Sequence, residues 1–229
     1  MDSEKNVETI ATALEELNEK VVFVGAAISC FLIDPVNHDD LRETVDIDAA
    51  AMISDYSNFT EFEGLLTQKG FKRSTKEKDP TCRWYYQGLQ FDLVPLVPCG
   101  THISNKWYKK SLNSVSVRTV GEIEIKHLDS IFYIASKLEA FFGRGNPEEL
   151  VSSHPDDNHD LEDIILLLDG RRSIVDELGE SEGEVREYIK SQFAVIIGLL
   201  GIEEFVRNCL SPHSIDERSK RVLGIFGGV

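Results

Sequence analysis

The sequence predicts an α+β fold, in which a mixed β-sheet with flanking helices is followed by a helical C-terminal half. Two observations predict this class. Short runs rich in β-branched and aromatic residues alternate with helical patterns up to about residue 120, whereas beyond residue 128 the apolar periodicity is helical throughout. We therefore expect two regions, 1–120 and 121–229, with a boundary that could fall anywhere between Cys99 and Leu128.

The elements of the first region follow from apolar spacing and from the residues that interrupt it. Helices are expected where apolar residues recur three and four apart, and strands where β-branched or alternating residues run between turn signals. Gly25, Gly70 and the pair Gln87-Gly88 mark element ends. In chain order the expected elements are a helix (7–17), a strand (21–24), a helix (26–32), a strand (44–49), a helix (57–69), two strands joined by a tight turn (82–86 and 89–94) and a strand-like segment (122–126).

The second region contains three helical patterns joined by polar loops. The expected helices are 128–142, 161–168 and 182–200, with another turn reaching Leu210. Residues 143–147 and 152–158 are expected to be loops. The glycine-containing end, 224–229, is expected to be a loose tail.

Composition predicts a cytoplasmic protein with no membrane association. Of the 229 residues 41% are hydrophobic and 28% are charged, and no apolar run approaches the roughly 18 residues that would cross a bilayer. The acidic start is unlike an export signal. The four cysteines lie far apart without a C-x-x-C pair, so reduced thiols are expected and neither a zinc site nor a disulfide framework is.

The formal net charge of −16 argues against wholesale attraction to nucleic acid, but the charge is unevenly distributed. Residues 66–126 contain eleven Lys or Arg against five Asp or Glu, whereas residues 127–187 contain five against sixteen. Basic clusters at 69–78 and 105–110 could guide an RNA end, and the second interleaves cations with Trp107 and Tyr108. A partly packed Trp107 is the competing interpretation, and a solvated surface is the alternative for the acidic half.

Three carboxylates are the strongest functional candidates. Residues two apart in a strand share a face, so Asp46 and Asp48 are expected to project together while Ile47 enters the opposite face. Asp92 lies within a later apolar strand that could run beside the first pair. Divalent cations, Mg²⁺ or Mn²⁺, would neutralise such a group, and two metals can clamp the attacking and leaving oxygens in phosphoryl transfer.

A D-x-D pair by itself is weakly diagnostic, but the order of parts around it is more specific. A strand, glycine turn and helix come first, the D-x-D strand follows about twenty residues later, and a single Asp comes in a later strand. This order resembles the DNA polymerase β-type nucleotidyltransferases, through Phe23-Val-Gly25-Ala-Ala, Arg42-x-Thr44-x-Asp46-Ile-Asp48 and Phe91-Asp92-Leu-Val-Pro. The form of these motifs is most similar to the AbiEii and MenT toxin group.

The resemblance, which spans about residues 21 to 170, implies a nucleotidyltransferase-type mixed sheet and a helical half that completes the active-site cleft. It implies transfer of a nucleoside monophosphate from an NTP to an acceptor hydroxyl, with a tRNA or other RNA end as acceptor and a cognate antitoxin as partner. It assigns metal binding to Asp46, Asp48 and Asp92. It assigns a catalytic role to Lys137 and to Asp160, which belongs to an acidic element that also contains Asp163. The phosphate ligands it implies are Gly25, Ala26, Ser29, Arg42 and Lys137.

Several alternatives stay open at the level of sequence. The acceptor could be a protein or a cationic small molecule of the aminoglycoside kind. The chain could also be a non-catalytic nucleotide-binding or interaction module, because Ala26 replaces the second Gly or Ser of the family's turn. Lys137 could instead pair with Asp129 or Glu139 on its helix. The acidic pair Asp160 and Asp163 could simply stabilise a helix N-terminus. A cluster in the loop before it is interpreted as surface and not as a metal site: His154, Asp156, Asp157 and His159.

Overall fold

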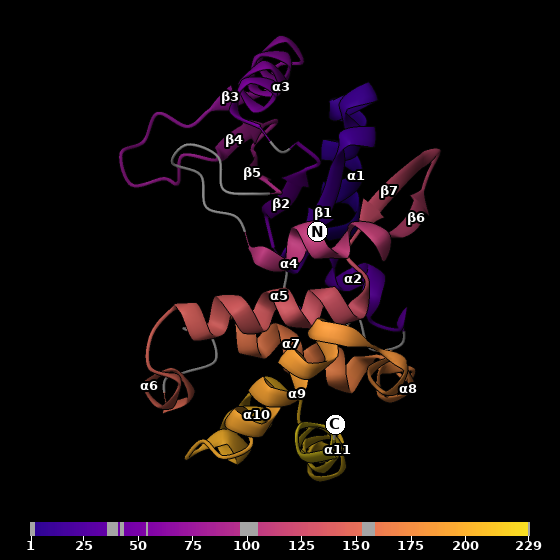
Figure 1. The fold of residues 1–229 in the computed structure, drawn as a ribbon, viewed down its shortest axis with the longest axis vertical. Coiled ribbons are helices and arrows are strands. Elements are labelled where there is room, and N and C mark those ends of the chain that lie inside the picture. The colour runs from indigo at the N-terminus through magenta and orange to yellow at the C-terminus, as the bar shows by residue number, and fades with distance from the viewer. Residues whose placement is uncertain are drawn as a thin grey trace. The chain divides into compact units, whose positions relative to one another are not determined.

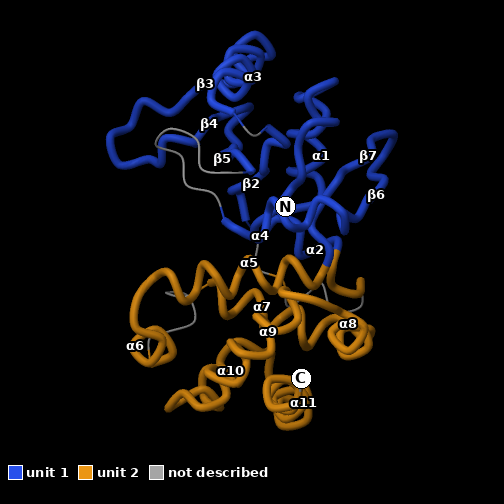
Figure 2. Tube along the Cα trace, viewed as in Figure 1, with its two compact units in different colours: residues 1–31, 42–129 blue, residues 32–41, 130–229 orange. Residues whose placement is uncertain are grey.

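The computed structural model describes residues 3–35, 41, 44–53, 55–96, 105–152 and 159–228. The chain divides into two compact units (Figure 2). Unit 1 comprises residues 1–31 and 42–129, and unit 2 comprises residues 32–41 and 130–229. Unit 1 carries a mixed β-sheet and unit 2 is helical, so the α+β class is confirmed.

Unit 1 contains all the strands that the structure describes (Figure 1). The strands are β1 (Val21–Val24), β2 (Asp46–Ala51), β3 (Lys72–Arg73), β4 (Arg83–Tyr86), β5 (Leu89–Pro95), β6 (Ser116–Val120) and β7 (Ile123–His127). The helices are α1 (Ser3–Leu14), η1 (Glu15–Lys20), η2 (Ala26–Ile28), α2 (Ser29–Leu32), α3 (Tyr56–Gln68), α4 (Lys106–Lys110) and η4 (Ser111–Asn113). The strands expected at 21–24, 44–49, 82–86, 89–94 and 122–126 are confirmed to within two residues at each end.

The sheet has the order β3-β4-β5-β2-β1-β7-β6. Two neighbouring pairs, β2 with β5 and β1 with β7, are parallel, and the other pairs are antiparallel. The D-x-D strand β2 is therefore central, with the Gly25 strand on one side and the Asp92 strand on the other. Because β7 pairs with β1, the sheet unit continues past residue 120, to residue 129.

The hairpin of β4 and β5 shows how the sequence fixes this register. Gln87 and Gly88 both have positive φ, 49° and 87°, as a two-residue turn that matches strand twist requires. The turn pairs Tyr86 with Leu89, and each step back along β4 is matched by one step along β5. Position 83 is consequently opposite position 92.

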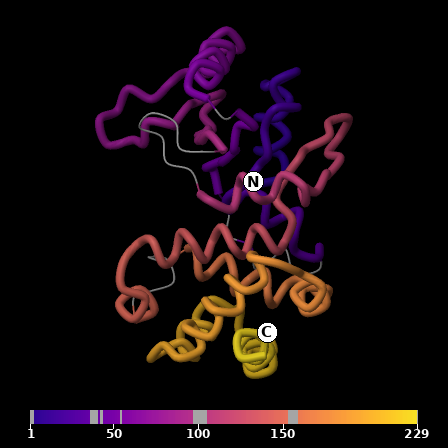
Figure 3. The backbone as a smooth tube through the Cα atoms, in the orientation of Figure 1, coloured from indigo at the N-terminus to yellow at the C-terminus, as the bar shows by residue number. Residues whose placement is uncertain are grey.

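Segments from the two ends of unit 1 lie side by side, as the backbone trace in Figure 3 shows. The Asn18 side chain donates a hydrogen bond to the carbonyl of Glu124 at 2.8 Å. Lys126 Nζ lies 2.7 Å from Oε2 of Glu19. These contacts hold η1 against the β6–β7 hairpin, while α1 packs on β7 and β2.

Unit 2 is a set of helices packed around α5 and α7. The helices are α5 (Ser130–Gly143), α6 (Pro147–Ser152), α7 (His159–Gly170), α8 (Ile174–Glu180), α9 (Gly183–Ile196), α10 (Ile202–Cys209) and α11 (Ile215–Gly228). The core helix α5 contacts α7, α8 and α9, and α11 contacts α7, α9 and α10. Throughout the described part of the chain, none of the helices combines the length and the apolar character that crossing a membrane requires.

One expectation for the second region is wrong. The expected loose tail at 224–229 is the end of α11 as far as Gly228, because Val222, Ile225 and Phe226 are buried and hold that turn in the core. The loop expected at 143–147 is confirmed to within one residue at each end, because α5 ends at Gly143 and the short helix α6 begins at Pro147. Helix α8 was not anticipated, and residues 153–158 lie outside the described part.

Candidate functional site

Asp46, Asp48 and Asp92 project from one face of the sheet. Along β2 the two aspartates are half-buried and alternate with buried residues such as Ile47, as expected from strand geometry. The parallel pairing of β2 with β5 places Asp48 directly beside Asp92. The structure therefore places the three carboxylates that the sequence singled out on the same face of the sheet.

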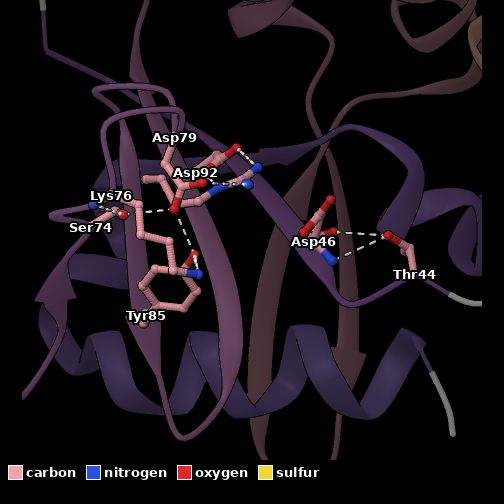
Figure 4. A network of polar contacts seen from close by, with 8 residues as sticks. Thr44, Asp46, Ser74, Lys76, Asp79, Tyr85 and Asp92 are labelled. Carbon is pink, nitrogen blue, oxygen red and sulfur yellow. Dashed lines mark hydrogen bonds and ion pairs between the residues drawn. The ribbon is translucent and has the colours of Figure 1, made fainter.

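Asp46 is held by its neighbour two residues earlier. Its N–H donates to Oγ1 of Thr44 at 3.2 Å, and this contact is drawn in Figure 4. The carbonyl of Thr44 in turn accepts a hydrogen bond from Asn6 of α1 at 3.3 Å. Oδ1 of Asp46 is buried and has no hydrogen-bond partner among the residues that the structure describes. A buried carboxylate oxygen without a partner is costly, so this atom is suited to a ligand.

Asp48 lies against the turn at Gly25. Val24, the last residue of β1, is opposite Asp48 in the sheet, and Gly25 follows with φ 72° and ψ −170°. A Cβ atom at position 25 would come 2.1 Å from Oδ2 of Asp48. Glycine is thus required here for two independent reasons, the backbone conformation and the space that the carboxylate occupies.

Asp92 is paired with Arg83, a residue that the sequence reasoning missed. Arg83 Nε lies 2.9 Å from Oδ1 of Asp92, and Nη2 lies 2.8 Å from Oδ2, which is a bidentate ion pair. Both side chains are largely buried, with 18% and 13% exposed. The hairpin register could have revealed this partner, because the predicted turn at Gln87-Gly88 already places position 83 opposite position 92.

A second carboxylate, Asp79, lies on the other side of Arg83, in the loop between β3 and β4. Its Oδ1 is 4.0 Å from Nη1 of Arg83. Its Oδ2 accepts hydrogen bonds from Ser74 Oγ at 2.7 Å and from the Tyr85 hydroxyl at 2.8 Å (Figure 4). These two hydrogen bonds lower the pKa of Asp79 below its usual value, so it is charged at neutral pH.

The Cys82 thiol lies near this negative face. Burial, and then the charges of Asp92 and Asp48, raise its pKa to about 11. A thiol with that pKa stays protonated at neutral pH and is a poor nucleophile. Cys82 is therefore not a reactive group at neutral pH.

The three carboxylates supply the kind of donor atom that a hard divalent cation prefers. Magnesium and manganese prefer oxygen ligands, which Asp46, Asp48 and Asp92 supply, and Oδ1 of Asp46 lacks a protein partner. Within the described ranges, no group of three or more His, Cys, Asp or Glu side chains is arranged to hold a metal ion. Both oxygens of Asp92 are directed to Arg83 in this arrangement.

Lys137 and Asp160, the other predicted catalytic residues, contact each other within unit 2. Lys137 Nζ lies 2.5 Å from Oδ2 of Asp163 and 3.3 Å from Oδ1 of Asp160. Arg144 also contacts Asp160. Burial by itself lowers the pKa of Lys137, but the nearby carboxylates outweigh it and raise the pKa well above its usual value. Lys137 thus pairs with α7, not with Asp129 or Glu139 as the alternative had it, and both aspartates of α7 are partners.

The remaining predicted residues are only partly described. Ala26 and Ser29 lie in η2 and α2 directly after the Gly25 turn, and Ser29 is buried. Arg42 lies outside the described residues, as do His154, Asp156 and Asp157. Trp107 is buried in unit 1, with Lys106 and Lys110 Nζ 5.3 and 5.1 Å from its ring centre. The packed interpretation of Trp107 is therefore confirmed, and its ring is not available for base stacking.

Comparisons of this chain with protein-family models, with curated proteins and with solved structures find no match.

Proposed function

We propose that this chain is a metal-dependent nucleotidyltransferase, which moves a nucleoside monophosphate from an NTP to an acceptor hydroxyl. The observation that carries the proposal is the register of the central sheet, in which Asp48 lies beside Asp92 and against the Gly25 turn. Asp46 adds a buried oxygen without a protein partner. The fold would then be the nucleotidyltransferase type of α+β sheet.

In the proposed reaction the acceptor oxygen bonds to the α-phosphorus while the bond to the bridging oxygen of pyrophosphate breaks. We assign Asp92 to orient the acceptor hydroxyl and accept its proton. The Gly25–Ala26 turn would contact the nucleotide phosphates through backbone N–H groups. Asp46, Asp48 and Asp92 would hold Mg²⁺ or Mn²⁺, which supplies charge neutralisation of the phosphates when bound.

The acceptor is proposed to be the 3′ end of an RNA. Basic side chains of unit 1 support this choice, because several of them are exposed, including Lys72, Lys78 and Lys109. Others are already paired: Lys69 contacts Glu15 and Glu16, and Arg73 contacts Glu63. The basic surface that is free to meet phosphates is therefore smaller than the sequence count suggests.

The test is transfer of α-labelled NTPs, each offered in turn with Mg²⁺, to total RNA, to added protein and to an aminoglycoside. We expect label in RNA and release of pyrophosphate by the wild type. Asp46→Asn and Asp48→Asn keep the size of each side chain but remove the charge, and each should lower transfer by roughly 10²-fold or more. Label in protein or in the aminoglycoside instead would retain the reaction and replace the acceptor.

Glu124→Gln is the matched control, since it removes an exposed carboxylate from β7 of the same sheet. It should leave transfer unchanged. Equal losses in Glu124→Gln and Asp46→Asn would mean that net charge, not the carboxylate face, controls the rate. Absence of transfer to every acceptor would contradict the enzymatic proposal.

A second candidate function is a nucleotide-binding module without transfer, and the observation that favours it is the bidentate Arg83–Asp92 pair. If that pair is permanent, Asp92 cannot serve as a metal ligand or a base. Nucleotide binding without transfer, unaffected by Asp92→Asn, would support this candidate. Transfer that is lost in Asp92→Asn would exclude it.

A further inference from the structure

Arg83 lies between two carboxylates that differ in how they are held. One is Asp92, its cross-strand neighbour, which it contacts through two nitrogens at 2.8 and 2.9 Å. The other is Asp79, whose Oδ1 is 4.0 Å from the third guanidinium nitrogen. The guanidinium therefore lies within ion-pair distance of both carboxylates and closer to Asp92 than to Asp79.

Asp79 is oriented to receive a cation. The hydroxyls of Ser74 and Tyr85 both donate to Oδ2, so they fix the carboxylate while leaving Oδ1 directed toward Arg83. Lys76 Nζ lies 3.2 Å from the Tyr85 hydroxyl and completes this network, which Figure 4 shows around Asp79. A carboxylate that already has two donors needs no rearrangement before it pairs with an arginine.

Asp92 needs a positive partner even when no metal is present. It lies beside Asp48 on neighbouring strands, and adjacent like charges destabilise a sheet. Arg83 supplies the charge. A divalent cation bound to the same carboxylate would lie about 2 Å from its oxygen, close to the guanidinium, and the two cations would repel each other.

From these contacts we propose that Arg83 is a built-in counterion that competes with a divalent cation for Asp92, and that Asp79 receives Arg83 when the cation binds. This inference rests on the proposed metal-binding role of Asp46, Asp48 and Asp92. Arg83 is then a positioning residue. It keeps the carboxylate face neutralised in the absence of a cation and lowers the affinity of that face for the cation.

The test is direct binding of Mn²⁺, without nucleotide, by calorimetry and by electron paramagnetic resonance. Arg83→Gln removes the competitor, so the affinity for Mn²⁺ should rise by roughly tenfold. Asp79→Asn removes the alternative partner, so the affinity should fall by a few-fold. Arg83→Lys keeps the charge without the bidentate geometry and should lie between the wild type and Arg83→Gln.

Two further variants separate this exchange from general electrostatics. Asp79→Asn also removes a negative charge and alters the hydrogen bonds from Ser74 and Tyr85. In the Arg83→Gln background it keeps these effects but no longer removes a partner of Arg83. Its effect on Mn²⁺ affinity should therefore be smaller in that background than in the wild type. Arg73→Gln removes a cation from β3 that contacts Glu63 and lies over the Trp84 ring, and it should leave Mn²⁺ affinity nearly unchanged.

The outcomes distinguish this inference from the proposed function. Asp46→Asn should abolish Mn²⁺ binding in both the wild-type and Arg83→Gln backgrounds. Mn²⁺ binding that is unchanged by Asp46→Asn would refute the proposed metal site itself. Binding that needs Asp46 but is unchanged or weakened in Arg83→Gln overturns only the inference. Failure of both the wild type and Arg83→Gln to bind Mn²⁺ overturns both. Circular dichroism checks that each variant folds. If Arg83→Gln does not fold, the two single variants Arg83→Lys and Asp79→Asn are used to test the inference.

Discussion

At the scale of single residues, the candidate charged side chains of the two units differ in how completely they are paired. Lys137 in unit 2 is enclosed by Asp160 and Asp163, and Arg144 balances the second negative charge. In unit 1, by contrast, Oδ1 of Asp46 is buried without a hydrogen bond among the residues that the structure describes. A closed set of charges is typical of structural ion pairs, whereas an unbalanced set is typical of a binding site.

Gly25 is where a single added methyl group should matter most. We expect Gly25→Ala to lower the free energy of unfolding by about 1–3 kcal/mol, because φ 72° with ψ −170° disfavours any side chain and the new Cβ would collide with Asp48. Urea denaturation measures the change. Displacement of Asp48 should also reduce nucleotidyl transfer.

Gly64→Ala is the matched control for that substitution. Gly64 lies on the exposed side of α3 with no atom within 4 Å of an added Cβ, so the same change should stabilise the protein by roughly 0.5–1 kcal/mol. Equal effects at the two glycines would show that the turn at Gly25 tolerates a side chain, and that its closeness to Asp48 is not a constraint.

At the scale of elements, the sequence is informative wherever a local signal determines the structure. The Gln87-Gly88 turn predicts the β4–β5 hairpin, and alternation predicts which face Asp46 and Asp48 share, because both signals act over a few residues. Where no local signal is present, packing between distant elements determines whether a segment is helical. Helix α11 continues through Gly224 because Phe226 packs into the core, and no local signal reports that packing.

The candidate site follows the same division. Three carboxylates and one glycine could be identified from sequence, and strand period explains why. Of their partners, only Arg83 could be identified in the same way. The other contacts join distant segments: Asn6 donates a hydrogen bond to Thr44 across 38 residues, and the partners of Lys137 lie on another helix. Contacts between distant segments depend on the packing of whole elements, which spacing does not encode.

Helix α8 is held by its buried residues Ile174 and Leu178 and by the hydrogen bonds of one carboxylate, and that carboxylate gives a prediction about pH. Glu177 accepts hydrogen bonds from Arg171 at 2.8 Å, from Ser173 at 2.6 Å and from Ser130 of α5. Burial alone would raise the pKa of Glu177, but these donors together lower it. The charged form is therefore favoured in the folded state, and its stabilising contribution is present above the unfolded pKa of about 4.3 and lost as pH falls through the lower folded value.

Glu177→Gln should accordingly destabilise the protein by about 1–2 kcal/mol at pH 7, and this difference should shrink as the pH approaches the folded pKa. Urea denaturation of the two proteins across that pH range measures it. Asp176→Asn, the neighbouring exposed carboxylate of the same helix, should have little effect at either end of the range. A pH-independent loss in Glu177→Gln would mean that packing, not charge, holds α8.

At the scale of the whole molecule, the acidic charge is concentrated in one unit. Unit 2 contains 22 acidic and 10 basic residues, a formal net charge of −12, whereas unit 1 contains 18 and 14, a net charge of −4. Self-repulsion of this size opposes the compact state and is screened by salt. Unit 1 therefore carries only a small part of the total charge of −16.

Substitutions on α9 can isolate this repulsion. Glu187 and Lys190 are both exposed and lie three residues apart, so any contact between them is lost whichever one is changed. Glu187→Gln makes unit 2 less negative and Lys190→Gln makes it more negative. At about 0.01 M salt, where screening extends over about 30 Å, we expect Lys190→Gln to melt about 1 °C or more below Glu187→Gln. At 1 M salt the Debye length is about 3 Å and the difference should disappear. A gap between the two variants that persists at high salt would show that helix propensity or local contacts, and not the accumulated negative charge, set the stability of this unit.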